Sequence, residues 1–356
     1  MAKRKISAPE KPTKKPSKSM PKVEVALCVP STVISHSNAR NLQHATFIAY
    51  QIAKAATLYN VSEIVVLSIP DAEVVAEKTG PKVVSAATGG QKIMFDDVAS
   101  SPKTEQNHKT RTDDDSLVLA TLLQYFVTPP YLVKAVFKDS KFRKKFKYAE
   151  KLPKIPSLPF MANNDVHKDF KEGLSVAKKT PKIVKKNKKV PGKKLSVTKY
   201  VNIGGDELLE LAGPDIPVNV RVTVDVKNKQ VVSPRDAYGV SGNKSTFGYF
   251  VRVSRSFTSI FTESTFPSGY TKSYYISCDD FYGKPDTGIK KETFGDISEG
   301  KVLLVMSNWK DLEASFSVEA FEGVDKVSEL FDGELEMEQG IRVEDAVMVG
   351  LARCRI

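Results

Sequence analysis

The sequence predicts an α/β fold in which a small antiparallel β-barrel interrupts a parallel sheet. Strand, helix and strand patterns follow one another directly after residue 22, and the same α/β pattern resumes near residue 257. Between these parts, short segments alternate apolar and polar residues at close spacing. Strands that alternate with helices form parallel sheets, whereas closely spaced alternating strands form sandwiches and barrels. A length of 356 residues agrees with about two domains.

The first half of the α/β domain is predicted over residues 23–160. VEVALCV and VSEIVVLSIP have the β-branched composition of buried strands. The segment between them places six apolar residues on one helical face: Leu42, Ala45, Ala49, Ile52, Ala53 and Ala56. A helix is expected at 113–127, because acidic residues in its first turn suit the positive end of the helix dipole. Pro129 and Pro130 are placed to start the next helix.

The barrel is predicted over residues 161–256. In PVNVRVTVDV the five valines share one face of a strand and the polar residues share the other, which predicts a half-buried antiparallel strand. VTKYVNI, QVVS and FGYFVRVS supply further short strands of this kind. The Lys/Pro-rich segment 178–194 is expected to be a loop of this region.

The second half of the α/β domain is predicted over residues 257–356, with strands at TKSYYIS, VLLVM and KVSELF and a closing helix at RVEDAVMVGLARCRI. The stretch KVLLVMSNWKDLE combines a buried strand with a polar loop, SNWKD. Ligands of α/β proteins bind at the carboxyl ends of strands, so a cofactor loop is expected here. The stretch contains none of the glycines that let a backbone approach a ligand closely.

The charge distribution indicates a polyanionic partner and favours nucleic acid. The net charge is +12, and the basic residues concentrate at 1–22, 138–151 and 178–194. Residues 1–22 are expected to form a disordered basic arm of the kind that directs nuclear import or touches RNA. A solvated tail without a function is the alternative for this arm.

Two other classes of protein lack support in the composition. The three cysteines form no CxxC pair and the four histidines lack metal spacing, so neither a disulfide framework nor a metal site is expected. No apolar run approaches the length of a membrane span.

Candidate RNA-binding residues lie in two places. In KDSKFRKKFKYAEK the cations are interleaved with Phe142, Phe146 and Tyr148, so bases could stack while the cations meet phosphates; the cations are Lys141, Arg143, Lys144, Lys145 and Lys147. An amphipathic helix with its aromatic residues in the core is the alternative. Arg252 and Arg255 lie on or just after a predicted barrel strand, and a solvated strand face explains Arg252 equally well.

Five segments together resemble the SPOUT class of RNA methyltransferases, in the branch in which an OB-fold-like barrel interrupts the catalytic domain. They are VEVALCVPSTV, IAYQIAKAATLYNVSEIVVLSI, LLQYFVTPPYLVKAVF, GYFVRVSRSFTSIF and QGIRVEDAVMVGLA. The resemblance implies a trefoil knot formed by the last strands and helix, which is an exception to the rule against knotted chains. It also implies a dimer paired through the knot, with Val343, Val347, Gly350 and Leu351 on the pairing stripe of the last helix.

The resemblance further implies that three loops of the knot bind S-adenosylmethionine. By position these loops are 276–283, 306–313 and 332–342. Eight residues on them are the candidate cofactor ligands: Ser277, Asp279, Ser307, Asn308, Glu313, Gln339, Gly340 and Arg342. The loops depart from the family pattern, because the arginine of the first loop is missing and Ser307, Asn308 and Asp311 stand where the second loop has glycines. No catalytic residue is assigned.

Two functions follow from the resemblance and its departures. One is an S-adenosylmethionine-dependent methyltransferase that acts on structured RNA, with ribosomal RNA as the expected substrate. The other is a catalytically weak or inactive RNA-binding factor in the assembly of the large ribosomal subunit. Both imply pre-ribosomal RNA as a partner, a homodimer or a heterodimer with a related chain, and a nuclear, nucleolar location.

Overall fold

The computed structural model describes residues 23–69, 114–137, 140–161, 169–177, 184–185, 188–189, 196–234, 236–238, 248–297, 299–319 and 323–354. The predicted basic arm and most of the Lys-rich segment 178–194 lie outside these residues. The conformations proposed for them therefore remain predictions.

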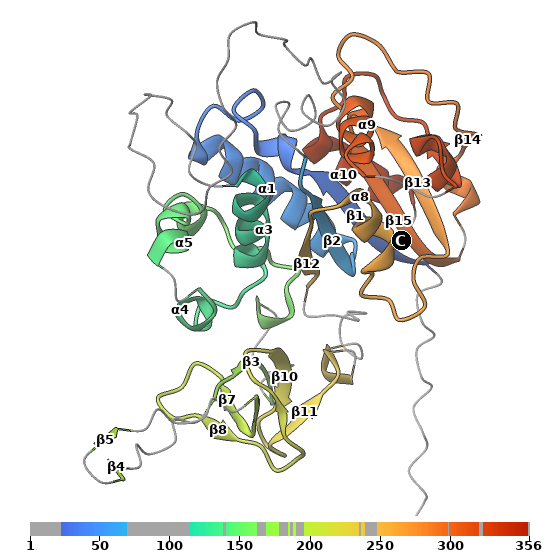
Figure 1. Cartoon of the computed structure of the whole chain (residues 1–356). Coiled ribbons are helices and arrows are strands. Elements are labelled where there is room, and N and C mark those ends of the chain that lie inside the picture. The colour runs from blue at the N-terminus through green and yellow to red at the C-terminus, as the bar shows by residue number, and fades with distance from the viewer. Residues whose placement is uncertain are drawn as a thin grey trace, which may run out of the picture.

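A seven-stranded parallel sheet forms the centre of the larger body (Figure 1). Its strand order is β12-β2-β1-β15-β13-β16-β14, and every neighbouring pair is parallel. The strands are β1 (Val23–Pro30), β2 (Glu63–Leu67), β12 (Phe250–Ser254), β13 (Lys272–Ser277), β14 (Lys291–Glu292), β15 (Gly300–Ser307) and β16 (Gly333–Leu335). The two halves of the chain thus meet in one sheet, which confirms the predicted α/β fold.

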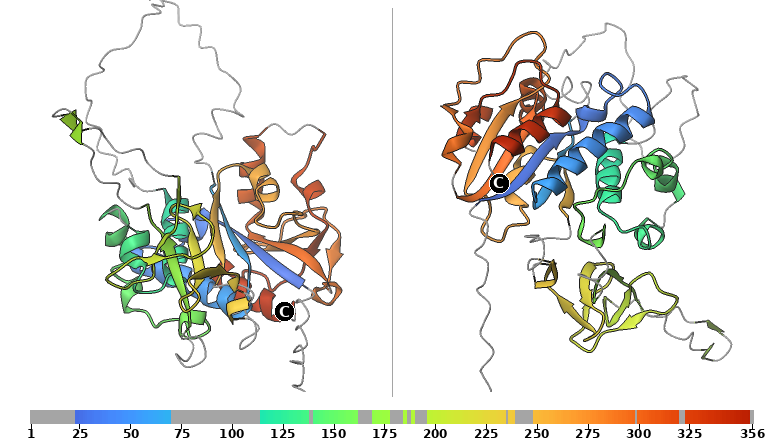
Figure 2. Two further views of the ribbon diagram at one scale, coloured as in Figure 1. Left: turned by 90° about the horizontal axis from the view of Figure 1, so that it is seen from below. Right: turned by 180° about the vertical axis from the view of Figure 1, so that it is seen from behind.

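Helices cover both faces of this sheet because alternate strand residues point to opposite sides. On one face, α1 (Leu42–Leu58), α3 (Asp115–Phe126) and α10 (Val343–Arg353) pack against residues such as Leu27 and Leu304. On the other face, α8 (Phe257–Thr262) and α9 (Trp309–Ser317) pack against residues such as Cys28 and Val305. Figure 2 shows α1 and α10 side by side over the sheet in the view from behind.

The remaining helical elements are short. They are α4 (Val133–Val136), α5 (Ser140–Lys145) and the 3-10 turns η1 (Ser31–Ile34), η2 (Ala149–Lys151), η3 (Pro159–Met161), η4 (Phe294–Asp296) and η5 (Val327–Leu330). No helix of the described residues has the length and apolar character that a membrane span requires.

A curled antiparallel sheet forms the smaller body, with strand order β11-β10-β3-β7-β8 (Figure 1). Its strands are β3 (Phe170–Ser175), β7 (Tyr200–Asn202), β8 (Leu209–Glu210), β10 (Arg221–Asp225) and β11 (Gln230–Val232). Two further antiparallel pairs join β4 (Val184–Lys185) to β5 (Lys188–Lys189), and β6 (Val197–Thr198) to β9 (Ile216–Pro217). Val201, Leu211 and Val224 form its small core, so the predicted antiparallel interruption is confirmed.

Three local predictions are wrong. FGYFVRVS was expected in the barrel, but its strand β12 pairs in parallel with β2 at the edge of the large sheet. Alternation alone cannot separate the two cases, because an edge strand also has a face that is partly exposed. KVSELF forms the turn η5 and not a strand, and the segment after β15 is not a loop, because α9 begins at Trp309.

The stripe predicted to pair two chains lies inside this chain. Val343, Val347 and Leu351 are fully buried in the core that α10 shares with α1 and the sheet. Gly350 lets α10 approach the sheet closely, since a Cβ at this position would lie 3.0 Å from Met306 Cε. The assignment of these residues to a dimer surface is therefore wrong, while the knot and the dimer themselves stay predictions.

Candidate active site at the carboxyl ends of the strands

Three chain segments meet where β13, β15 and β16 end. Ser277 and Ser307 are register partners at the last position of β13 and β15. Past them, the backbone N–H of Cys278 donates to the carbonyl oxygen of Ser307 at 3.1 Å, and that of Asp279 donates to Ile341 at 2.8 Å. The loops after β13 and β16 are therefore fastened to each other and to β15. This is the convergence that the resemblance implied for 276–283, 306–313 and 332–342.

Asp279 and Asp280 provide the unusual electrostatics of this site. Asp279 has a φ of +57°, a left-handed conformation that Asp tolerates better than most residues. Among the described residues, Asp279 Oδ1 and Asp280 Oδ2 are buried and have no hydrogen-bond partner. Buried polar atoms are nearly always paired, so two adjacent exceptions indicate a place for a ligand.

Burial also raises the pKa of both carboxyls to about 6. For Asp279 the nearby acids Glu344 and Asp311 raise the pKa further, while Arg342 lowers it. For Asp280 the carboxylate of Glu334 raises the pKa, and Lys284 and Lys310 lower it. Such a pair can exchange protons near neutral pH, which ordinary exposed aspartates do not do.

The polar side chains of the second predicted loop form hydrogen bonds within the protein. Asn308 is the N-cap of α9, and its side chain accepts a hydrogen bond from the backbone N–H of Lys310 at 2.9 Å. The Ser307 hydroxyl is buried and donates to the carbonyl oxygen of Asn308 at 3.0 Å. Asp311 accepts a hydrogen bond from the Thr32 hydroxyl at 2.5 Å, which ties α9 to the turn after β1.

The three candidate cofactor ligands of the third predicted loop lie in different environments. The Arg342 guanidinium pairs with Glu344 at 2.7 Å and reaches the carbonyl oxygen of Asn38 at 3.4 Å. Gly340 has a φ of +71°, and the Phe281 ring lies beside it. Gln339 is exposed. Arg342 therefore lies near Asp279 but is already paired, whereas Gln339 is turned to solvent.

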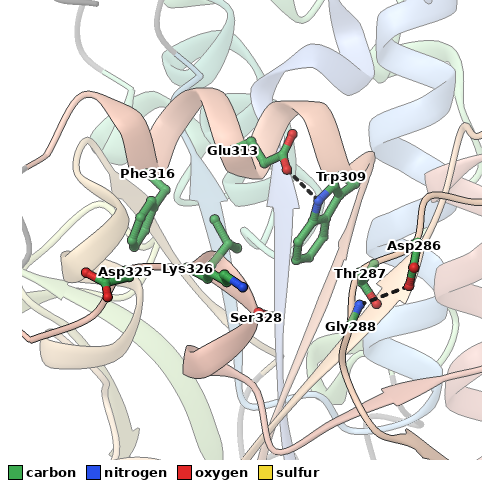
Figure 3. A pocket seen from close by; sticks show the side chains of 10 residues that line it. Asp286, Thr287, Gly288, Trp309, Glu313, Phe316, Asp325, Lys326 and Ser328 are labelled. Carbon is green, nitrogen blue, oxygen red and sulfur yellow. Dashed lines mark hydrogen bonds between the residues drawn. The ribbon is translucent and has the colours of Figure 1, made fainter.

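A cavity of about 490 Å³ lies beside these loops, between α9, η5 and residues 286–288 (Figure 3). Trp309 and Phe316 of α9 give it aromatic walls, and Trp309 Nε1 donates to Glu313 Oε1 at 2.8 Å. Its size is that of pockets for small molecules and cofactors. Of the eight predicted cofactor ligands, Glu313 is the one that lines this cavity.

Sequence reasoning missed several residues of the site. Asp280 was passed over although it is the second acid of the doublet that follows β13. Trp309, the one tryptophan of the chain, belongs to the predicted loop SNWKD and is not among the predicted ligands, although it lies two residues after a strand end, where ligands bind. No metal-binding cluster of His, Cys, Asp or Glu is present in the part of the chain that the structure describes.

The basic segment 141–147 has exposed cations but a buried aromatic residue. Arg143, Lys144 and Lys147 are exposed. Phe146 is 1% exposed and stacks on Tyr125 with ring centroids 4.3 Å apart. The idea that Phe146 stacks on bases is therefore wrong, and the core alternative is right for this residue. The side chains of Lys141 and Phe142 lie outside the described residues.

The two arginines near β12 also have different environments. Arg252 is not on a barrel strand, and its guanidinium is used within the protein: it pairs with Glu63 at 2.6 Å and donates to the carbonyl oxygens of Ser259 and Ile260. The solvated strand face proposed for Arg252 is therefore wrong too. Arg255, just after the strand, is exposed. The RNA-binding role of these cations stays a prediction, and the exposed ones are geometrically suited to it.

Comparison with known proteins identifies the family of this chain. A family sequence profile described as "Putative RNA methyltransferase" matches residues 24–354. Two Saccharomyces cerevisiae proteins described as "Putative methyltransferase" are 35% and 31% identical to this chain, covering 87% and 92% of it and 86% and 87% of their own lengths. The 28S rRNA (uridine-N(3))-methyltransferase of Homo sapiens is 24% identical, over 92% of this chain and 77% of its own.

Proposed function

Since the chain belongs to the family of RNA methyltransferases whose profile spans residues 24–354, we propose that it methylates a base nitrogen of ribosomal RNA with S-adenosylmethionine as the methyl donor. The observation that carries the proposal is the pair Asp279 and Asp280, two adjacent carboxyls that each have a buried oxygen without a hydrogen-bond partner among the described residues and a pKa raised to about 6. They lie where three strand ends meet, which is where α/β proteins bind their ligands.

The residues present suit S-adenosylmethionine. The cofactor carries a positive sulfonium, a positive amino group and ribose hydroxyls, each complementary to a carboxylate, and a carboxylate of its own, for which Lys326 in the cavity lining is a complementary cation. Asp279 and Asp280 have unused buried acceptor atoms, and Glu313 lines the adjoining cavity. Trp309 and Phe316 offer that cavity aromatic surface for the adenine. When bound, the cofactor supplies a methyl group that is activated by the positive charge on sulfur.

The chain's own contribution to the chemistry would be a general base. A base nitrogen that carries a proton, such as the uridine N3 named for the human relative, must lose that proton to expose its lone pair. The N–H bond breaks and its proton passes to a carboxylate, while the N–CH₃ bond forms as the donor's S–CH₃ bond breaks and S-adenosylhomocysteine leaves as a neutral thioether. We assign this step to the Asp279–Asp280 pair, because an acid with a pKa of about 6 is ionised at neutral pH and can accept a proton.

Substrate RNA would be held by the basic surface. Arg143, Lys144, Lys147 and Arg255 are exposed, and neutralising phosphates with such residues releases counterions. The basic arm 1–22 and the Lys-rich segment 178–194 would add contacts of the same kind. A nucleolar location and a homodimer or heterodimer with a related chain belong to the same proposal.

The alternative, an RNA-binding assembly factor without catalysis, also has an observation in its favour. The side chains of Ser307, Asn308 and Asp311 hold the second loop in place through bonds within the protein. They replace glycines of the family pattern, so that loop has fewer groups to offer a cofactor.

Cofactor binding and RNA methylation together separate the two functions. Trp309 lines the cavity and is the one tryptophan of the chain, so its fluorescence reports binding there and calorimetry measures the affinity. Fragments of 28S rRNA would then be incubated with protein and S-adenosylmethionine, and their nucleosides analysed for 3-methyluridine. We expect binding and a methylated uridine; RNA binding without either would establish the assembly factor.

A further inference from the structure

The loop after Asp280 carries two exposed aromatic side chains that the proposed chemistry does not use. Phe281 is 54% exposed and Tyr282 is 105% exposed, which makes Tyr282 the most exposed large aromatic side chain among the described residues. Single apolar side chains on a surface are common, but adjacent exposed rings form a patch of the kind that marks an interaction site. Their position is specific, because they directly follow the Asp279–Asp280 pair.

The surroundings of these rings favour a nucleic acid over an apolar partner. The Phe281 ring rests near Gly340, whose Cβ, if present, would lie 3.6 Å from Phe281 Cδ1. Lys284 and Lys310 lie close enough to lower the pKa of Asp280; Lys310 is exposed, whereas the side chain of Lys284 is partly exposed, donates to the carbonyl oxygen of Met337 and lies 3.9 Å from Glu336. An aromatic surface bordered by cations is the arrangement on which a base stacks while its phosphates meet positive charge.

We propose that Tyr282, backed by Phe281, is the stacking surface that receives a nucleobase of the substrate RNA beside the Asp279–Asp280 pair. The inference rests on the proposed function, since it concerns the same site. A base nitrogen in a folded RNA can be reached only after its nucleotide has left the stack. The exposed ring replaces the lost stacking contact, and the two carboxyls lie one and two residues from Phe281 along the chain.

The test compares four variants by RNA affinity and by methylation kinetics. Tyr282→Ala should raise the Kd for RNA and the KM by about 5- to 150-fold, the measured range for one base–aromatic stack. Tyr282→Phe should keep wild-type values and Tyr282→Leu should not, because stacking needs the ring and not the hydroxyl or the bulk. Phe250→Ala is the matched control, since Phe250 is 46% exposed on β12, at the opposite end of the sheet from β14.

Two further measurements keep a failure of this inference distinct from a failure of the proposed function. A short oligouridine carrying one 2-aminopurine should lose fluorescence on binding the wild type and Tyr282→Phe, but not on binding Tyr282→Ala. S-adenosylmethionine affinity, followed through Trp309, should be equal in all variants. Wild-type methylation with unchanged RNA affinity and KM in Tyr282→Ala overturns the stacking surface alone. Quenching that depends on Tyr282 in a protein that methylates no RNA overturns the proposed function and leaves the stacking surface standing.

Discussion

The structural clusters and the candidate site hold their buried carboxylates in opposite ways: Glu63 and Glu172 are fully paired, whereas Asp279 and Asp280 each keep a buried oxygen without a hydrogen-bond partner among the described residues. In the larger body, Glu63 of β2 is fully buried and accepts hydrogen bonds from three side chains: Arg252 at 2.6 Å, Tyr270 at 3.0 Å and Thr265 at 3.2 Å. In the smaller body, Glu172 of β3 repeats the arrangement with Arg221 at 3.3 Å, Thr223 at 2.8 Å and Tyr238 at 2.9 Å. Each buried charge has a cation and two hydroxyl donors.

The Glu172 cluster also joins the two bodies. Arg221 Nη2 donates to the carbonyl oxygen of Val127 at 2.7 Å, and the Tyr131 hydroxyl donates to that of Glu172 at 3.1 Å. Gly204 belongs to the same contact, because a Cβ there would lie 2.5 Å from the Tyr131 ring. The antiparallel body is thereby linked to the larger body by side-chain contacts of its buried cluster.

Asp279 and Asp280 lack this set of partners, although they are also largely buried. Each retains a buried oxygen without a donor among the described residues. The comparison teaches that burial alone does not mark a functional acid in this protein. The unmatched acceptors do, because a fully paired carboxylate is already committed to the fold.

The largest expected effect concerns catalysis. Asp279→Asn, which keeps the shape and tolerates the positive φ, should lower the methylation rate about 10²- to 10⁴-fold, because it removes a general base. Rates would be measured at saturating RNA and S-adenosylmethionine on 28S rRNA fragments. Glu336→Gln, at an exposed acid in the third loop, is the control and should retain the wild-type rate. Full activity in Asp279→Asn would assign the base to Asp280 or to no residue of the pair.

The next effect concerns the paired acids. Arg252→Met should lower the free energy of unfolding by about 3–5 kcal/mol, because it leaves Glu63 charged and buried without its cation. Urea denaturation would measure the loss, and Glu63→Gln combined with Arg252→Met should recover part of it. RNA affinity at low temperature should stay at the wild-type value. A stable Arg252→Met protein with weakened RNA binding would restore Arg252 to the RNA surface and break the comparison.

The sequence was sufficient for the parallel sheet because β1, β2 and β15 are apolar runs flanked by clear helical periods. It was not sufficient for β12, whose alternation suits an edge strand as well as a barrel strand. Nor could it place Phe146, since aromatic spacing is the same whether a ring meets Tyr125 or a base. The sheet that a strand joins and the partner of an aromatic ring depend on the residues that pack against them, and those residues are distant in the chain.

The site shows the same division. Asp279 is predicted as a cofactor ligand by the family resemblance, and that role stays a prediction, whereas its missing hydrogen-bond partners become visible only when the loops converge. The family resemblance predicts that Asn308 and Asp311 stand at positions where a cofactor loop has glycines. In the folded protein Asn308 caps α9 and Asp311 binds Thr32, which is 279 residues away. Replacing them with glycine would therefore loosen the loop as well as clear space.

A smaller effect is expected in the pH dependence. Because the pKa of both aspartates is raised to about 6, the ionised form that can accept a proton is lost as pH falls through that value. The methylation rate should therefore fall about tenfold between pH 7 and pH 5, with an apparent pKa that belongs to the coupled pair. RNA affinity measured at each pH separates this from weaker substrate binding. A rate that stays constant down to pH 5 would exclude the pair as the base.

The smallest expected effect is a change in folding stability, whose direction follows from the raised pKa of Asp279. The pKa of Asp279 rises from 3.8 to about 6 on folding, so the folded state holds more protons than the unfolded state between these values. The contribution of this group to stability is therefore present below about pH 4 and is lost as pH rises through about 6. Asp279→Asn removes that loss, and the variant should be more stable than the wild type by about 1 kcal/mol at pH 7.5, after allowance for partial solvent screening.

The difference should disappear at pH 4, where the aspartate is protonated in the folded state and asparagine is its neutral counterpart. Thermal unfolding of both proteins at the two pH values measures it as a rise of about 2 °C in Tm at pH 7.5 alone. Glu172→Gln is the matched contrast, because it deprives the buried Arg221 of its counter-charge and should lower Tm at pH 7.5. If Asp279→Asn also lowers Tm there, Asp279 has partners in solution like those of Glu63, and the two regions bury their acids in the same way.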